Sequence, residues 1–172
     1  MMRKTFVRLE NNEEALSKLV KYMEKADNTF NIPLSSRVDI LDYAKKLLRK
    51  GVVLATIKDD FIVGIIGFYC NDKDSKKGYI TVASLTKDAQ KEGYNVRDLF
   101  YASNLIALKN GISSFYCEAV DHRAAILYQR IGFTEICREN INNITHYHLM
   151  CDIKKWMTNN SERQITISNW EE

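Results

Sequence analysis

The stretch from residue 79 to residue 119 constrains the fold most, because it places one helix between two strand-like runs. Residues 79–85 (YITVASL) and 113–119 (SSFYCEA) have the composition of strands. The segment 96–111 between them is helical, with Gly111 at its end and apolar side chains at helical spacing: Val96, Leu99, Phe100 and Ala107. Two strands joined through a helix pair in parallel with a right-handed crossover, so we expect these two to be parallel neighbours.

The remaining segments predict mostly antiparallel strands around that pair. Strands are expected at 5–10, 52–58, 61–70, 133–139 and 146–153, with hairpin turns at Asp59-Asp60 and at 140–143. Helices are expected at 11–26, 38–51 and 122–132. Their inward residues are Leu16, Leu19, Val20 and Met23; Ile40, Ala44, Leu47 and Leu48; and Ala124, Leu127, Tyr128 and Ile131.

The fold class is therefore mixed α/β, a predominantly antiparallel sheet with one central parallel pair and helices on both faces. Residues 1–152 are expected to form one domain. Residues 153–172 are a polar extension that forms either an edge strand or a tail.

Composition excludes several classes of function. The net charge is only +3 over 172 residues, and the lysines are scattered, so we expect no nucleic-acid partner. No apolar run is long enough to span a membrane, and the N-terminus does not read as a signal peptide. The four cysteines are well separated and show no CxxC spacing, which favours free thiols in a reducing cytoplasm.

The turn QKEGYN, residues 90–95, is the first candidate for a ligand site. It lies between a strand and the start of a helix, where unpaired N–H groups and the helix dipole favour an anion. The turn is not a P-loop, since no Lys-Ser or Lys-Thr follows it. It is not a dinucleotide-binding turn either, because it has one glycine where that motif needs three.

Two segments together resemble the GNAT superfamily of N-acetyltransferases. The first is LTKDAQKEGYN, whose Gln90, Gly93 and Asn95 fall on the marked positions of the family's Gln/Arg-x-x-Gly-x-Gly/Ala loop. The second is DHRAAILYQRIGF, which is similar to Asn-x-x-Ala-x-x-Leu-Tyr-x-x-x-Gly-Phe at Ala124, Leu127, Tyr128, Gly132 and Phe133. The order of elements matches as well, so the resemblance covers residues from about 4 to 152.

The resemblance implies acetyl-CoA as co-substrate, lying where the two parallel strands separate. Backbone N–H groups of the loop would hold its pyrophosphate: Lys91, Glu92, Gly93, Tyr94 and Asn95. A backbone N–H near Leu85 or Thr86 would meet the acetyl carbonyl. A substrate amine would then attack directly, and Tyr128 would protonate the departing thiolate as general acid. The alternative for Tyr128 is a core aromatic residue.

Three positions depart from the family pattern. Lys87 stands where the family commonly has proline, and Asn95 stands where a smaller residue is usual. Asp121 replaces an asparagine, which places an acceptor near a ligand that carries several negative charges. These departures predict weaker or rearranged CoA binding, so a non-catalytic module that binds CoA or a protein partner is the alternative function.

The general base and the amine site are less sharply indicated. The strand 79–85 contains no carboxylate or histidine, and Glu118 on the neighbouring strand is the nearest candidate, directly or through water; it is equally well read as a solvent-facing strand residue. Phe30 and Arg37, in the linker between the first two helices, are candidates for binding a small-molecule amine; the alternative is a capped helix start with a solvated arginine. His146 and His148 have the spacing of a metal pair, but no third ligand is evident and we expect no metal. In this family the closing strands often pair, so a homodimer is expected.

Overall fold

The computed structural model describes residues 3–160 and 162–170. Their eight strands form one sheet in the order β6-β7-β5-β4-β3-β2-β1-β8. The strands are β1 Lys4–Arg8, β2 Val52–Lys58, β3 Phe61–Asp72, β4 Lys77–Leu85, β5 Ser114–Ala119, β6 Thr134–Ile141, β7 Ile144–Asp152 and β8 Ile165–Ser168. The α-helices are α1 Glu13–Ala26, α2 Ile40–Lys50, α3 Lys87–Lys91, α4 Val96–Lys109, α5 His122–Ile131 and α6 Ile153–Asn159, with short 3₁₀ turns η1 Asp27–Thr29 and η2 Leu34–Ser36.

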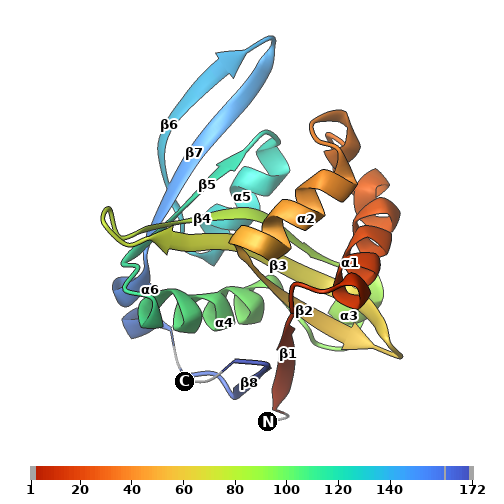
Figure 1. Cartoon of the computed structure of the whole chain (residues 1–172). Helices are drawn as coiled ribbons and strands as arrows, with labels where there is room; N and C mark the ends of the chain where they lie inside the picture. Colours follow the sequence, from red (N-terminus) through yellow and green to blue (C-terminus); the bar gives the residue numbers. More distant parts are fainter. Residues whose placement is uncertain (1–2, 161, 171–172) are drawn as a thin grey trace.

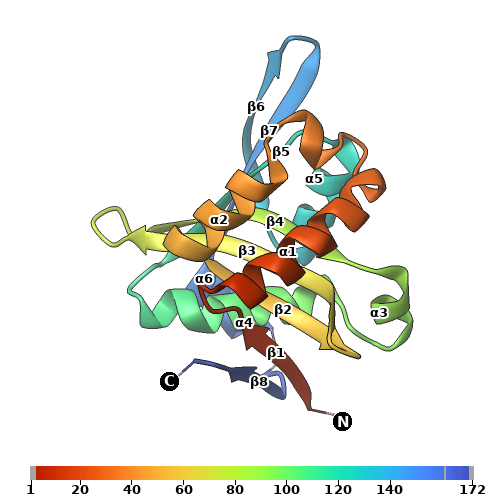
Figure 2. The ribbon, with the colours of Figure 1, turned by 45° about the vertical axis from the view of Figure 1, so that its right-hand side comes forward.

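The helices cover both faces of the sheet, as predicted (Figure 1). Helices α1 and α2 pack on one face through a core that includes Leu19, Met23, Leu47 and Ile65. Helices α4, α5 and α6 share the core of the other face, which includes Phe68, Phe100, Phe115 and Trp156. Figure 2 shows α1 and α2 lying side by side across the strands, and the β6–β7 hairpin projecting beyond the body of the molecule.

The parallel pair at the centre is confirmed: β4 and β5 run in the same direction, from Lys77↔Ser114 to Ile80↔Cys117. The hairpin turn at Asp59-Asp60 is also confirmed, since both residues have positive φ, as a tight two-residue turn requires. The β6–β7 turn is tighter than expected. It uses only Asn142 and Asn143, also at positive φ, so both strands are longer than the sequence suggested.

Two inward faces differ from the prediction. In α1, Tyr22 and Ala15 are buried while Leu16 and Val20 are only half-buried. In α5, Leu127 is 40% exposed, because α5 packs on β5 and β7 and covers them with its Ala125–Ile131 side.

The polar C-terminal residues join the sheet and the core. Residues 165–168 form β8, which pairs in parallel with β1 at the edge of the sheet, so a second parallel pair exists. Helix α6 was not predicted. Its Trp156 is buried, packs edge-on against Phe100 with ring centroids 4.9 Å apart, and donates its indole N–H to the Ile131 carbonyl at 2.7 Å.

Candidate active site

Strands β4 and β5 part after Ile80 and Cys117. Beyond that pair β4 continues to Leu85 alongside β3 only, while Glu118 and Ala119 of β5 pair with β7. The register between β3 and β4 also shifts between Gly67↔Val82 and Phe68↔Ile80, so β4 carries an irregularity at Thr81, where the separation begins. The structure thus contains a gap in the middle of its sheet, bounded by one unpaired edge of β4.

Backbone groups of β4 face this gap. The N–H of Thr86 donates to the Val63 carbonyl at 2.9 Å, so Thr86 is excluded as a donor to a ligand. In an antiparallel pair the next residue points the other way, which directs the N–H of Leu85 toward the gap. The Leu85 carbonyl on the same side already accepts from Gln90 Nε2 at 3.2 Å. Of the two donors expected from the sequence, only Leu85 remains available.

Tyr128 lies on the α4–α5 face, near Cys117 of the last β4–β5 pair and near Tyr43. Its ring packs edge-on against Phe133 with centroids 5.3 Å apart and belongs to the rim of that core. Burial raises the pKa of Tyr128 far above its ordinary value, and the neighbouring Cys117 and Tyr43 raise it further. The phenol is therefore protonated at neutral pH, as a proton donor must be.

The opposite face contributes two tyrosines that the sequence analysis did not select. Tyr43 of α2 hydrogen-bonds the Thr81 hydroxyl at 2.5 Å, and burial raises the pKa of Tyr43 to about 12. Tyr22 of α1 hydrogen-bonds the Ser84 hydroxyl at 2.6 Å. Both contacts join a helix to the separated part of β4. Helical spacing could not predict their role, because it depends on hydrogen bonds to residues of β4, which is far away in the sequence.

The loop 90–95 differs from the expected cradle of free N–H groups. Residues 87–91 form α3, and the next three N–H groups are already used inside the loop. Those of Glu92, Gly93 and Tyr94 donate to the carbonyls of Asp88, Gln90 and Ala89 at 3.0–3.1 Å. The expectation that these three N–H groups bind pyrophosphate is wrong for this conformation. Gly93, at φ +91°, makes the turn that lets the chain leave α3.

Asn95 caps helix α4. Its side-chain oxygen accepts the N–H of Asp98 at 2.9 Å, which takes one of the free donors of the first turn. The N–H groups of Val96 and Arg97 remain without a helix carbonyl in reach, since they lie in that first turn. An anion at this helix end would thus bind fewer N–H groups than the sequence suggested.

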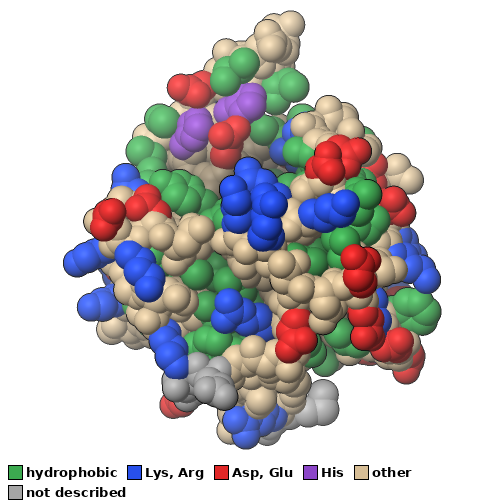
Figure 3. All heavy atoms as spheres, viewed as in Figure 1, with side chains coloured by type: hydrophobic (Ala, Val, Ile, Leu, Met, Phe, Trp, Pro, Cys, Tyr) green, Lys and Arg blue, Asp and Glu red, His purple; other side chains and the backbone are tan. Residues whose placement is uncertain are grey.

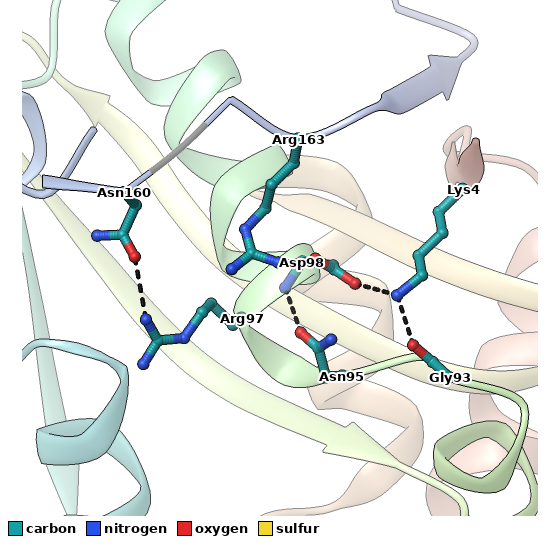
Figure 4. A network of polar contacts seen from close by, with 7 residues as sticks. All are labelled: Lys4, Gly93, Asn95, Arg97, Asp98, Asn160 and Arg163. Carbon is teal, nitrogen blue, oxygen red and sulfur yellow. Dashed lines mark hydrogen bonds and ion pairs between the residues drawn. The ribbon is translucent and has the colours of Figure 1, made fainter. Parts of the chain in front are cut away.

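A buried carboxylate lies directly behind the loop. Asp98, 3% exposed, is held by Arg163 from the segment before β8 and by Lys4 of β1 (Figure 4). Lys4 also donates to the Gly93 carbonyl. Arg97 donates to the side-chain oxygen of Asn160 at 3.0 Å, a contact that Figure 4 also draws, and to the Arg130 carbonyl at 2.7 Å. Residues near both ends of the sequence, Lys4 on one side and Asn160 and Arg163 on the other, therefore bind the first turn of α4.

The other loop side chains are exposed or used locally. Lys91 is exposed and Glu92 pairs with Lys58 of the β2–β3 hairpin, while Tyr94 packs against Phe6. Asp121 caps α5 by accepting the N–H of Arg123 at 2.9 Å. The Asp121 carboxylate thus binds the first turn of α5.

Glu118 is the first residue of β5 beyond the last β4–β5 pair, so it stands at the base of the gap. Alternation along β5 puts it on the face opposite Cys117, the face of α1 and α2. Its carboxylate contacts Nδ1 of His146 on β7. His148 binds Glu139 of β6 at 3.2 Å, so each of the two histidines has its own carboxylate. Figure 3 shows histidine and acidic side chains together at the base of the projecting hairpin.

Phe30 and Arg37 lie in the linker between α1 and α2, which Asp27 closes by accepting two hydrogen bonds from Ser35. Phe30 is half-buried against the α1–α2 core. Arg37 is exposed and lies near Tyr43, whose pKa it lowers slightly against the effect of burial. Of these two predicted residues, Arg37 is the one near Tyr43, which hydrogen-bonds Thr81 of β4.

No helix among the described residues is long and apolar enough to cross a membrane. No family model matches the sequence. The curated proteins contain no match either.

Solved structures do match. An acetyltransferase from Desulfovibrio desulfuricans assigned to the GNAT family superposes with a TM-score of 0.69 at 12% identity, covering 86% of this chain and 98% of that one. An aminoglycoside 6′-N-acetyltransferase complexed with coenzyme A gives 0.68 at 12%, covering 89% and 97%. A chain of the NatC complex bound to Gag peptide and CoA gives 0.65 at 18%, covering 88% and 99%.

These likenesses extend over most of both chains in each comparison. The chain has the fold of the GNAT acetyltransferases.

Proposed function

We propose that this protein is an acetyl-CoA-dependent N-acetyltransferase, which moves an acetyl group to a primary amine of a small molecule by direct attack in a ternary complex. The observation that carries the proposal is the gap between β4 and β5, at whose edge the Leu85 N–H is unused; the buried, protonated phenol of Tyr128 near Cys117, where the two strands part, supports it. Bound acetyl-CoA would supply the thioester. An extended pantetheine arm fits the unpaired edge of β4, since such an edge pairs with any extended chain.

The residues divide the work as follows. The N–H of Leu85 would stabilise the negative charge that develops on the acetyl oxygen. Tyr128 would protonate the sulfur as the carbon–sulfur bond breaks. The amine would lose its proton on the Glu118 side of the gap, and Arg37 would contact the rest of the amine substrate. No covalent enzyme intermediate is required, so the buried thiols need no role.

Two observations favour a second function, a non-catalytic module that binds CoA or a protein partner. The loop 90–95 uses three of its N–H groups internally, and Asn95 occupies a fourth donor at α4. Fewer free N–H groups would lower the affinity for the pyrophosphate of CoA, as expected of a protein that binds CoA weakly or has lost catalytic activity.

Two measurements separate these functions. Acetyl-CoA at 100 times its Kd should stabilise the fold by about 2.7 kcal/mol in thermal unfolding. Thiol release would then be screened against amino sugars, amino acids, polyamines and peptides with free N-termini; the peptides are included because the NatC structure holds a peptide. Stabilisation without thiol release would favour the module, and the absence of stabilisation at millimolar acetyl-CoA would reject both the enzyme and a module that binds CoA.

A further inference from the structure

The two carboxylate–histidine pairs beside the gap share one face of the sheet. Glu118 lies opposite His148 in the β5–β7 register, and Glu139 lies opposite His146 in the β6–β7 register. Side chains directly opposite each other point to the same face, as do residues two apart on a strand. The titratable groups on this face of β5, β6 and β7 are thus Tyr116, Glu118, Glu139, His146, His148, Asp152 and the thiol of Cys137, which lies opposite His148.

The pairs differ in which ring nitrogen they use. His146 meets Glu118 through Nδ1, whereas His148 meets Glu139 through Nε2. A carboxylate next to Nδ1 holds the proton of a neutral imidazole there, which leaves Nε2, at the outer tip of the ring, as a proton acceptor. In His148, by contrast, Nε2 itself contacts the Glu139 carboxylate.

The positions of the pairs differ as well. Glu118 is the first β5 residue past the last β4–β5 pair, while Glu139 belongs to β6, which two other strands separate from β4. The His146 side chain is 20% exposed and that of Glu118 is 47% exposed, so the pair is accessible from outside the protein without being fully open to solvent.

We propose that His146 is the general base of the acetyl transfer and that Glu118 is its positioning residue. This inference rests on the proposed function and deepens it. Nε2 of His146 takes a proton from the ammonium of the substrate, directly or through one water. The neutral nitrogen then forms a bond to the acetyl carbon while the carbon–sulfur bond breaks. The thiolate receives the proton of Tyr128, and the tyrosinate regains a proton from the nitrogen that has become an amide.

This assignment changes the role given to Glu118 by the sequence. Imidazole is the side chain whose ordinary pKa lies nearest neutral pH, so it accepts a proton from an ammonium more readily than a carboxylate does. The carboxylate would fix the tautomer and the ring orientation and would stabilise the imidazolium once it forms, as the carboxylate does in a catalytic triad.

The test compares His146→Gln with His148→Gln, a matched control from the same strand, the same face and the same kind of ion pair. With an amine found by thiol release, His146→Gln should lower kcat/KM at pH 7 about 100-fold, the lower range for general base catalysis. It should remove the acidic limb of the pH profile, and free imidazole should restore part of the rate. His148→Gln should retain the wild-type profile, and both variants should keep wild-type affinity for CoA.

A second readout does not depend on turnover. Nitrogen-15 NMR of the histidine rings should find the neutral form of His146 protonated on Nδ1, and Glu118→Gln should weaken that preference. A proton on Nε2 would overturn the inference. So would a His146→Gln enzyme with a normal rate and pH profile. If wild-type protein releases no thiol with any amine class, the proposed function itself fails and the role of His146 fails with it.

Discussion

The side-chain oxygen of Asn95 accepts the backbone N–H of Asp98 at 2.9 Å, in the first turn of the helix that faces the pyrophosphate end of the proposed CoA site. Helix capping and anion binding draw on the same N–H groups, because only the first turn of a helix has donors without intrahelical partners. Asn95 therefore stabilises α4 and competes with a phosphate for the same donor.

Asn95→Gly should strengthen CoA binding. The change frees the Asp98 N–H and removes a side chain from the approach, and a glycine cap costs only a few tenths of a kcal/mol of stability. A hydrogen bond to a charged group contributes about 1.5 kcal/mol, so calorimetric titration should give an affinity roughly tenfold higher. Asn95→Asp is the matched control: it keeps the cap and adds a negative charge, so it should weaken binding. If Asn95→Gly also weakens binding, the amide contacts CoA directly.

Tyr128→Phe should lower kcat about 100-fold and leave the Kd for CoA unchanged, since only the transition state needs the phenol proton. Because burial raises the pKa of Tyr128 above its ordinary value near 10, its proton is retained through the alkaline range. The wild-type rate should accordingly not fall between pH 7 and 9.5 through loss of this proton.

Tyr43→Phe serves as the control for that measurement. It removes the hydrogen bond to Thr81 and keeps the proton donor, so the loss in kcat should be much smaller than for Tyr128→Phe. A wild-type rate that declines near pH 8.5, with the decline absent from Tyr128→Phe, would show that the phenol ionises in that range and would contradict the burial argument.

The sequence predicted those parts of the fold that local pattern controls. Asp59-Asp60 marks a turn by its own conformational preference, and the helix between β4 and β5 forces a crossover whatever surrounds it. Helix α6 escaped prediction because only Ile153 and Trp156 of its seven residues are buried. The sequence left an edge strand and a tail as alternatives for residues 153–172; β8 is that edge strand, and its partner β1, more than 150 residues earlier, could not be identified from local pattern.

The candidate site was predictable to the same extent. Tyr128 and the Leu85 end of β4 follow from motif positions, since each is fixed by its own element. Which N–H groups are already used could not be read from the sequence, because that depends on whether residues 87–91 wind into α3. The contact between His146 and Glu118 joins residues on two strands and depends on their register.

Asp98→Asn should destabilise the protein strongly. The Asp98 carboxylate is 4% exposed and pairs with Lys4 and Arg163, whose side chains are themselves largely covered. Removing one partner of a buried ion pair leaves the other charge uncompensated, at a loss of about 3 kcal/mol. Urea unfolding measures the loss, and Glu14→Gln, in an exposed ion pair with Lys18, should leave the midpoint unchanged. Equal midpoints for Asp98→Asn and wild type would mean that the network at the start of α4 contributes nothing to folding.

Asn104→Leu should stabilise the protein. Asn104 is fully buried in α4, and among the described residues neither its amide nitrogen nor its oxygen has a hydrogen-bond partner. A buried, unpaired polar group is destabilising by about 1–3 kcal/mol, whereas leucine has a similar size and favours helix. The melting temperature should rise by about 2–4 °C for each kcal/mol gained in a chain of this length. The neighbouring Ser103 is equally buried but donates to the Phe100 carbonyl at 2.8 Å, so Ser103→Ala should bring no comparable gain. A lower melting temperature for Asn104→Leu would indicate that a bound water satisfies the amide.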